Sequence, residues 1–163
     1  MTIFVTSDHH LGHQRIIQYC NRPFSSVEEM NNTIINNWNR KIKSKDTVFF
    51  IGDMSYRSYP IEHWIPYLNG KITFIKGNHD TFDHTPYYHN YILKYKRINF
   101  FLTHDPSNVP WNWHSWAICG HHHNNFPETQ PFYNKLGKRF NVSVEMTGYK
   151  PVNMDYIYKL ATL

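Results

Sequence analysis

Short apolar runs alternate with polar, histidine-bearing or acidic segments along most of the chain. Five of these runs are rich in β-branched or aromatic residues and end beside potential metal ligands, and they span residues 3–5, 47–51, 72–75, 98–102 and 116–119. Apolar runs of this length are typical of buried strands. The pattern therefore predicts a sheet core in which strand after strand leads into a polar segment.

Helical periodicity follows the first apolar run. Ser26 and Glu29 have the spacing of a capping box, and the helix that they begin is expected to extend to about residue 43. The apolar positions at helical spacing are Met30, Ile34, Ile35, Trp38 and Ile42. A second helix is expected over residues 61–68, ended by Asn69 and Gly70.

The later part of the chain is richer in strands. Further strands are expected over residues 91–95 and 140–146, in addition to the runs at 98–102 and 116–119. Strands that alternate with helices favour an α/β fold with a partly parallel sheet. A second sheet stacked on the first would accommodate the later strands, and residues 1–163 are expected to form a single domain.

The residues at the strand ends supply the donors of a metal site. Ligands of open α/β sheets bind beyond the carboxyl ends of the strands, where residues distant in sequence can meet. The candidate metal ligands are Asp8, His10, Asp53, Asn78, His104, His121 and His123. Nitrogen and oxygen donors without thiolate suit Mn, Fe, Ni, Co or Zn. Two such ions roughly 3.5–4 Å apart could bind a phosphoryl oxygen and activate a water molecule.

Composition narrows the classes of function. Of the 163 residues, 40% are hydrophobic and 17% aromatic, which indicates a folded chain and argues against disorder. The net charge of +5 favours anionic partners, both phosphate esters and nucleic acids. Several of the twelve histidines cluster in residues 9–13 and 121–123, away from the ends, where a purification tag would lie. Clustered histidine favours metal binding over a chance surface grouping.

Cysteine use and the start of the chain bear on localisation. Cys20 and Cys119 form no Cys-x-x-Cys pair, so reduced thiols in a cytoplasmic protein are expected. We expect no signal peptide, because the first apolar run has no charged leader and is short. We also expect no membrane partner, because no segment approaches the length of a transmembrane helix.

The polar motifs occur in the order of a known family signature. They read Asp8-x-His10, Gly52-Asp53, Gly77-Asn78-His79-Asp80, His104 and Gly120-His121-x-His123. Each is weak alone, but the ordered set resembles the calcineurin-like metallophosphoesterases, and residues 140–145 resemble the closing strand of their compact bacterial, archaeal and phage members. The resemblance implies a four-layer α/β/β/α sandwich of two stacked mixed sheets flanked by helices, and a phosphoric ester hydrolase.

The resemblance also implies a role for each matched residue. One ion would be bound by Asp8, His10, Asp53 and His123. The other would be bound by Asp53, Asn78, His104 and His121. A hydroxide bridging the two ions would attack phosphorus, Asn78 would help to stabilise the developing charge, and His79 would be the general acid. Two divalent ions are expected, Mn first, with Fe, Ni, Co, Zn or Mg as alternatives.

Four residues beside the ligands in sequence are expected either to support the site or to point away from it. Asp80 is expected to orient His79. His13 either contributes to the substrate site or its surroundings, or caps the next helix. His122 is expected to point away from the ions, because side chains alternate along an extended segment. His9 is expected to face away from its neighbours as well.

Arginines and aromatic segments leave two interpretations open. Arg15, Arg22 and Arg57 follow motif segments and could bind phosphate through their planar guanidinium groups, although ordinary exposed arginine is the simpler interpretation of each. Residues 87–91 and 111–116 are aromatic. They could stack on the bases of a single-stranded nucleic acid, but packing in the core or in a subunit interface is the commoner outcome and is favoured here.

The preferred hypothesis is hydrolysis of a phosphate mono- or diester, with a nucleotide or cyclic nucleotide as the expected substrate. A nuclease acting on nucleic-acid ends is one alternative, and a non-catalytic scaffold on the same fold, as in the retromer subunit, is another. Met54 and Ser55 follow Asp53 where protein serine/threonine phosphatases have an Asp-Arg-Gly extension, so protein dephosphorylation is disfavoured. A homodimer is expected on general grounds.

Overall fold

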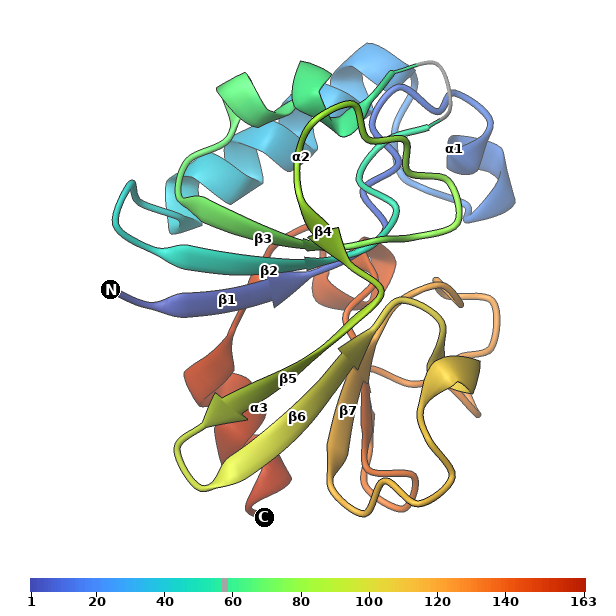
Figure 1. The fold of residues 1–163 in the computed structure, drawn as a ribbon. Coiled ribbons are helices and arrows are strands. Elements are labelled where there is room, and N and C mark those ends of the chain that lie inside the picture. The colour runs from blue at the N-terminus through green and yellow to red at the C-terminus, as the bar shows by residue number, and fades with distance from the viewer. Residues whose placement is uncertain (57–58) are drawn as a thin grey trace.

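Two five-stranded mixed sheets face one another in the computed structural model, which describes residues 1–56 and 59–163 (Figure 1). The first sheet has the order β10-β1-β2-β3-β4. Its parallel strands are β1 (Ile3–Thr6), β2 (Thr47–Ile51), β3 (Lys71–Ile75) and β4 (Tyr87–Tyr88), and β10 (Val152–Asn153) is antiparallel to β1.

The second sheet has the order β5-β6-β7-β9-β8. Its three central strands are parallel: β6 (Ile98–Thr103), β7 (Trp116–Cys119) and β9 (Arg139–Asn141). The two edge strands are antiparallel to their neighbours: β5 (Asn90–Tyr95) and β8 (Tyr133–Asn134). The predicted α/β class, with two mixed sheets and flanking helices, is therefore confirmed.

Two helices cover the outer face of the first sheet (Figure 1): α1 (Ile16–Tyr19) and α2 (Val27–Lys41). The predicted cap begins α2, since the Ser26 hydroxyl oxygen accepts a hydrogen bond from Glu29 N at 3.1 Å. The Glu29 carboxylate reaches back to Ser25 N at 2.8 Å. Because Ile34 and Trp38 share one helical face, both are buried against the sheet.

A second core fills the space between the two sheets. Val5 and Ile51 enter it from the first sheet, and Phe100 and Phe140 enter it from the second. Helix α3 (Met154–Ala161) adds Met154 and Ile157 to this core. The outer face of the second sheet has a smaller cluster, in which Val109 and Trp113 pack against buried residues of β6 and β7. Burial on both faces explains why the strands read as continuous apolar runs.

Two predicted elements differ from the structure. Residues 61–68 form two short 3₁₀ helices, Ile61–His63 and Ile65–Tyr67, instead of one α-helix. Pro66 lies in the second of them, and proline both removes a helical N–H donor and disfavours the α conformation of the residue before it. The prediction of one helix was wrong because it weighed the apolar spacing above Pro66.

The predicted strand over residues 140–146 ends early, at Asn141. The Asn141 side-chain oxygen accepts hydrogen bonds from Ser143 N at 3.1 Å and from the Ser143 hydroxyl at 2.7 Å, and a 3₁₀ helix spans Val144–Thr147. Asparagine side chains that bond to backbone two residues on favour turns over strands. This turn brings Ser143 and Glu145 toward the ends of the strands.

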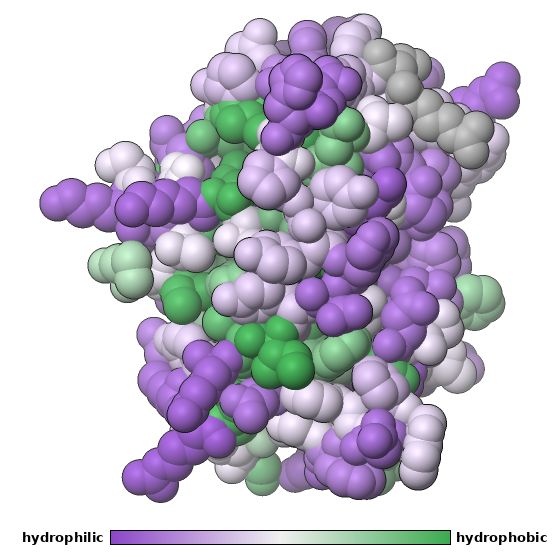
Figure 2. Space-filling model, viewed as in Figure 1, coloured by the Kyte–Doolittle hydropathy of each residue, from purple (hydrophilic) through white to green (hydrophobic). Residues whose placement is uncertain are grey.

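The surface is mixed in character. Hydrophobic residues lie in small separate groups among hydrophilic ones on the face shown in Figure 2. Within the described part of the chain, no helix combines the length and the apolar character that crossing a membrane requires.

Candidate metal centre

The predicted ligands lie where the carboxyl ends of the strands meet. Asp8 and His10 follow β1, Asp53 follows β2, and His104 and His121 follow β6 and β7. Backbone hydrogen bonds join the first two segments, from Asp8 N to the Gly52 carbonyl and from His10 N to the Asp53 carbonyl, both at 3.0 Å. Parallel strands place these segments at the same edge of each sheet.

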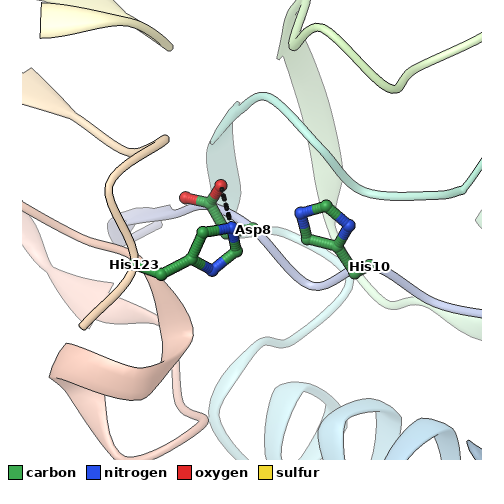
Figure 3. Close-up of side chains that lie close together, drawn as sticks. All are labelled: Asp8, His10 and His123. Carbon is green, nitrogen blue, oxygen red and sulfur yellow. Dashed lines mark ion pairs between the residues drawn. The ribbon is translucent and has the colours of Figure 1, made fainter. Parts of the chain in front are cut away.

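Asp53 lies at the middle of the cluster. Its Oδ2 is 3.4 Å from His10 Nε2 and 3.3 Å from His104 Nε2. On one side, His123 Nε2 is 3.6 Å from Asp8 Oδ1, and His123 approaches from a segment distant in sequence (Figure 3). On the other side, Asn78, which follows β3, completes the cluster.

Asn78 joins the two histidines of the second sheet. Its Oδ1 is 3.0 Å from His104 Nε2 and 3.1 Å from His121 Nδ1. The structure thus brings all of the predicted ligands into one cluster: Asp8, His10, Asp53, Asn78, His104, His121 and His123.

Backbone strain concentrates at these same residues. Nine non-glycine residues in the described part of the chain have positive φ. Five of them are predicted ligands: Asp8, His10, Asp53, His121 and His123. Such conformations cost about 1–3 kcal/mol each and persist at functional sites, where surrounding structure enforces them.

Two glycines of the motifs make room for the carboxylates. A Cβ at Gly77 would overlap the Asp53 carboxylate and backbone, and a Cβ at Gly120 would overlap Ser7 and the Asp8 carboxylate. Any side chain at these positions would therefore displace a predicted ligand. The physical reason for glycine before Asn78 and His121 is this close approach.

The acids and imidazoles of the cluster shift one another's pKa in the metal-free chain. Burial alone would raise the pKa of Asp53, but the neighbouring imidazoles of His10 and His104 lower it well below the usual range. Burial would lower the pKa of His104, but Asp53 and Asp8 raise it to about 9. Burial would likewise lower the pKa of His123, but Asp8 and Glu145 raise it to about 11. In the metal-free chain, protons on His104 and His123 therefore offset the negative charge of the carboxylates, which a bound cation would otherwise do.

Metal ions fit this donor set. The ligand atoms of Asp8, His10 and His123 lie within 4.8 Å of one another, and so do those of Asp8, Asp53 and His104. His10 Nε2 is buried and has no hydrogen-bond partner among the described residues. A buried imidazole nitrogen without a partner is costly unless an ion binds it.

The predicted general acid, His79, borders the cluster. Its backbone N donates to Asp53 Oδ1 at 2.9 Å, and its ring centroid is 5.2 Å from that of His10. His13 also belongs to this border, since its Nδ1 is 3.2 Å from His10 Nδ1 and its ring stacks on Tyr56 at 3.7 Å. Helix α1 receives no side-chain cap, so His13 does not cap it.

Asp80 has a different set of partners from the expected one. Its carboxylate accepts hydrogen bonds from the backbone N of Asp53 and Met54 at 2.8 Å and from Gly77 N at 3.0 Å. No hydrogen bond joins it to His79 among the described residues. Burial and the charge of Asp53 raise the pKa of Asp80 to about 6. Asp80 therefore holds together the segments that carry Asp53 and Asn78.

The three arginines differ in position. Arg22 is buried, contrary to the expectation of an exposed residue, and donates to the backbone carbonyls of Asp8 at 2.7 Å and His9 at 2.8 Å. Arg15 is exposed at the N-cap of α1. Arg57 lies outside the described residues.

Arg22 and Glu145 are supporting residues that sequence reasoning did not assign to the site. Arg22 pairs with Glu145 at 2.7 Å, and Glu145 accepts a hydrogen bond from His123 Nδ1 at 3.0 Å. No local motif marks Glu145, and the sequence offered Arg22 only as a phosphate-binding or an ordinary exposed residue. Ser143, whose hydroxyl oxygen lies 2.9 Å from Asp8 Oδ2, was missed for the same reason as Glu145.

Two further histidines, expected to point away from the ions, adjoin the cluster, and the ring of His122 is 5.3 Å from that of the predicted ligand His121. His9 is buried beneath the cluster, with edge contacts to Trp38 and Phe50. His122 contacts Phe126 with a ring separation of 5.8 Å. The reason given for His122 was wrong, because positive φ at His121 and His123 makes this segment a turn and not an extended strand.

The aromatic segments are divided between core and surface. Trp113 packs on Phe101, and Trp116 belongs to the core between the sheets. In contrast, Trp111 is 95% exposed, and Tyr87 and Tyr88 are exposed on β4. The favoured interpretation, core or subunit interface, is thus confirmed for Trp113 and Trp116, and a subunit interface stays a prediction for these three.

Two facing mixed sheets with carboxylates, an amide and imidazoles at their joined strand ends form an α/β protein with a donor set that metal ions fit. Residues 1–151 match the sequence model of the calcineurin-like phosphoesterases, and the chain belongs to this family. The family resemblance inferred from the ordered motifs is confirmed.

The chain is also similar to three individual proteins. The chain is 44% identical over 162 residues to an uncharacterized protein of Methanocaldococcus jannaschii, covering 97% of this chain and 90% of that protein. It is 35% identical over 79 residues to the gene 66 protein of Mycobacterium phage L5, covering 46% of this chain and 38% of that protein. A protein of unknown function from Aquifex aeolicus shares the fold, with a TM-score of 0.72, 22% identity and 98% coverage of both chains.

Proposed function

We propose that this chain is a phosphoesterase with two divalent metal ions, expected to be Mn²⁺, that hydrolyses a nucleotide or cyclic nucleotide. Membership of the family supports metal-dependent phosphoester hydrolysis in general. The observation that carries the specific proposal is the position of Asp53. Its Oδ2 lies 3.4 Å from His10 Nε2 and 3.3 Å from His104 Nε2, which suits a carboxylate shared by two ions.

The ions, when bound, supply Lewis acidity, which polarises phosphoryl oxygens and lowers the pKa of water. The protein supplies orientation and proton transfer. Asn78 directs its oxygen toward His104 and His121, which leaves its amide nitrogen to donate to a phosphoryl oxygen. His79, half-buried beside His10, protonates the leaving oxygen.

A cavity beside the cluster provides room for the substrate. Its volume is about 540 Å³, within the usual range of small-molecule sites. It opens onto Asn78, His104 and His121 and is otherwise lined mainly by hydrogen-bonding side chains, which include Lys76 and Asn108. Lys76 and the amides suit the phosphate of a nucleotide, and the Asp105 carboxylate, which also lines the cavity, can accept hydrogen bonds from its hydroxyl groups.

The alternative with an independent observation is a nuclease. A second hollow, of about 340 Å³, is lined by the exposed Trp111 together with Lys138 and Arg139. An exposed indole beside cations suits the stacking of unpaired bases next to phosphates. Binding of an oligonucleotide there would fall steeply with salt.

The test compares substrates on protein purified without a histidine tag and loaded with Mn²⁺. A phosphomonoester chromogen, a phosphodiester chromogen, a cyclic nucleotide and a short single-stranded oligonucleotide are assayed side by side. We expect turnover of the nucleotide, and a decrease in kcat of about 10²–10⁴-fold in His79→Ala with both ions retained. His84→Ala, a change at an exposed histidine, is the control.

The outcomes separate the alternatives. Preferential cleavage of the oligonucleotide, sensitive to salt, would favour the nuclease. Two bound ions without turnover of any substrate would favour a scaffold. Unchanged kcat in His79→Ala would contradict the assignment of the general acid.

A further inference from the structure

Glu145 lies directly behind the predicted ligand His123. Its Oε1 accepts a hydrogen bond from His123 Nδ1 at 3.0 Å. The other ring nitrogen, Nε2, faces Asp8 Oδ1 at 3.6 Å. An imidazole that donates through Nδ1 presents its Nε2 lone pair, so the partner of one nitrogen decides which nitrogen can bind a metal.

Arg22 holds Glu145 in this position. Its Nη2 is 2.7 Å from Glu145 Oε1, and its Nε donates to the same oxygen at 2.9 Å. The same guanidinium donates to the carbonyl of Asp8 at 2.7 Å. One rigid side chain therefore connects the segment of the ligand Asp8 with the partner of the ligand His123.

Stability alone is a weak reason for this arrangement. The side chains of Arg22 and Glu145 are 0% and 3% exposed. Burying two charges costs desolvation energy that their attraction often only offsets. In addition, Glu145 Oε2 is buried without a hydrogen-bond partner among the described residues. An ion pair with this cost, in contact with a ligand, is better explained by control of that ligand.

We propose that Glu145, held by Arg22, is a positioning residue that directs His123 Nε2 to the ion shared with Asp8 and His10. The inference rests on the proposed function, because it requires that these three residues bind an ion. The other ion would be held by residues that include Asn78 and His121, for which the structure gives no contact with this pair among the described residues, and it provides an internal comparison.

A competing arrangement would use Cys20. Its thiol, His123 and Glu145 also place ligand atoms within 4.8 Å of one another. In that arrangement His123 would bind through Nδ1. Glu145 Oε1 already accepts hydrogen bonds from Arg22 Nε and His123 Nδ1 and forms an ion pair with Arg22 Nη2, which favours the positioning role.

The experiment is a titration of wild type, Glu145→Gln and Asp46→Asn with Co²⁺, followed by calorimetry and visible absorption. Asp46 is the matched control, because it is also a buried carboxylate but lies at the opposite end of β2 from Asp53, where it accepts hydrogen bonds from Thr2 N and Lys43 N. We expect Glu145→Gln to bind one ion about 10–100-fold more weakly and the other normally. Asp46→Asn should bind both as wild type does.

Wild-type affinity for both ions in a folded Glu145→Gln variant would overturn the inference. A thiolate-to-cobalt band that disappears in Cys20→Ser would overturn it in favour of the competing arrangement. Nitrogen NMR of Zn²⁺-loaded wild type tests the same point without any variant: a proton on His123 Nδ1 supports the inference, and a metal bond at Nδ1 contradicts it. Wild type that binds no ion would contradict the proposed function itself.

Discussion

The two sides of the metal centre differ in how far the protein encloses them. On one side, the side chains of Asp8 and His123 are 0% and 9% exposed, and Arg22 and Glu145 lie behind them. On the other side, His121 is 35% exposed, Asn78 is exposed, and a cavity of about 540 Å³ opens beside them. The comparison indicates a rigid side that fixes geometry and an open side that admits substrate.

Removing what the two sides share should have the largest effect. Asp53→Asn replaces the carboxylate that lies 3.4 Å from His10 and 3.3 Å from His104. We expect loss of tight binding of both ions and a decrease in kcat of about 10³-fold, because an amide is a weaker bridging ligand. The number of ions bound per chain measures the loss of binding, and turnover with Mn²⁺ measures the decrease in kcat. Asp83→Asn, at an exposed aspartate, is the control.

Ion content and turnover equal to those of Asp83→Asn would show that Asp53 is not shared, and the two sides would then have to be treated as separate sites.

Removing one histidine from each side should show that the enclosed side contributes more to the unfolding free energy than the open side does. His123→Ala deletes the partner of two buried acids, so we expect the metal-free protein to lose about 3 kcal/mol of unfolding free energy. His121→Ala removes a partly exposed side chain and should change the unfolding free energy by less than about 0.5 kcal/mol. Both variants should bind one ion more weakly. Denaturant unfolding with a chelator present measures the difference, and equal losses would refute the contrast.

The smallest expected effect is a loss of stability of the metal-free protein at alkaline pH. Burial opposes charge on both histidines, but carboxylates raise the pKa of His123 to about 11 and of His104 to about 9. A raised folded-state pKa adds stability that is complete below the unfolded pKa of about 6.5 and is lost as pH rises through the folded value. His9, whose pKa burial lowers to about 3, is neutral in this range and does not contribute.

The melting temperature of chelator-treated protein should therefore fall by a few degrees between about pH 7 and pH 9, since about 1 kcal/mol corresponds to 2–4 °C at this chain length. The decrease should be shallower in His123→Ala and absent when ions replace the protons. A melting temperature that rises over this interval would contradict the assigned directions.

The candidate ligands and most strands could be predicted from the sequence, because each ligand lies within a few residues of the end of an apolar run. The run 47–51 became β2, and Asp53 is two residues beyond its end. Helix α2 was predictable because Ser26 and the apolar spacing act within a few turns. Where a local signal opposed the periodicity, as Pro66 did, the periodic interpretation failed.

What the sequence determined by itself is therefore the local part: the order of strands and helices, and the residue types placed at the strand ends. Only the tertiary structure decided that Arg22 is buried and that it meets Glu145 across 123 positions of sequence. The burial of an arginine depends on which distant acid and carbonyl groups surround it, and no neighbouring residue records them. The unequal enclosure of the two sides of the metal centre was decided in the same way, by how the two sheets pack.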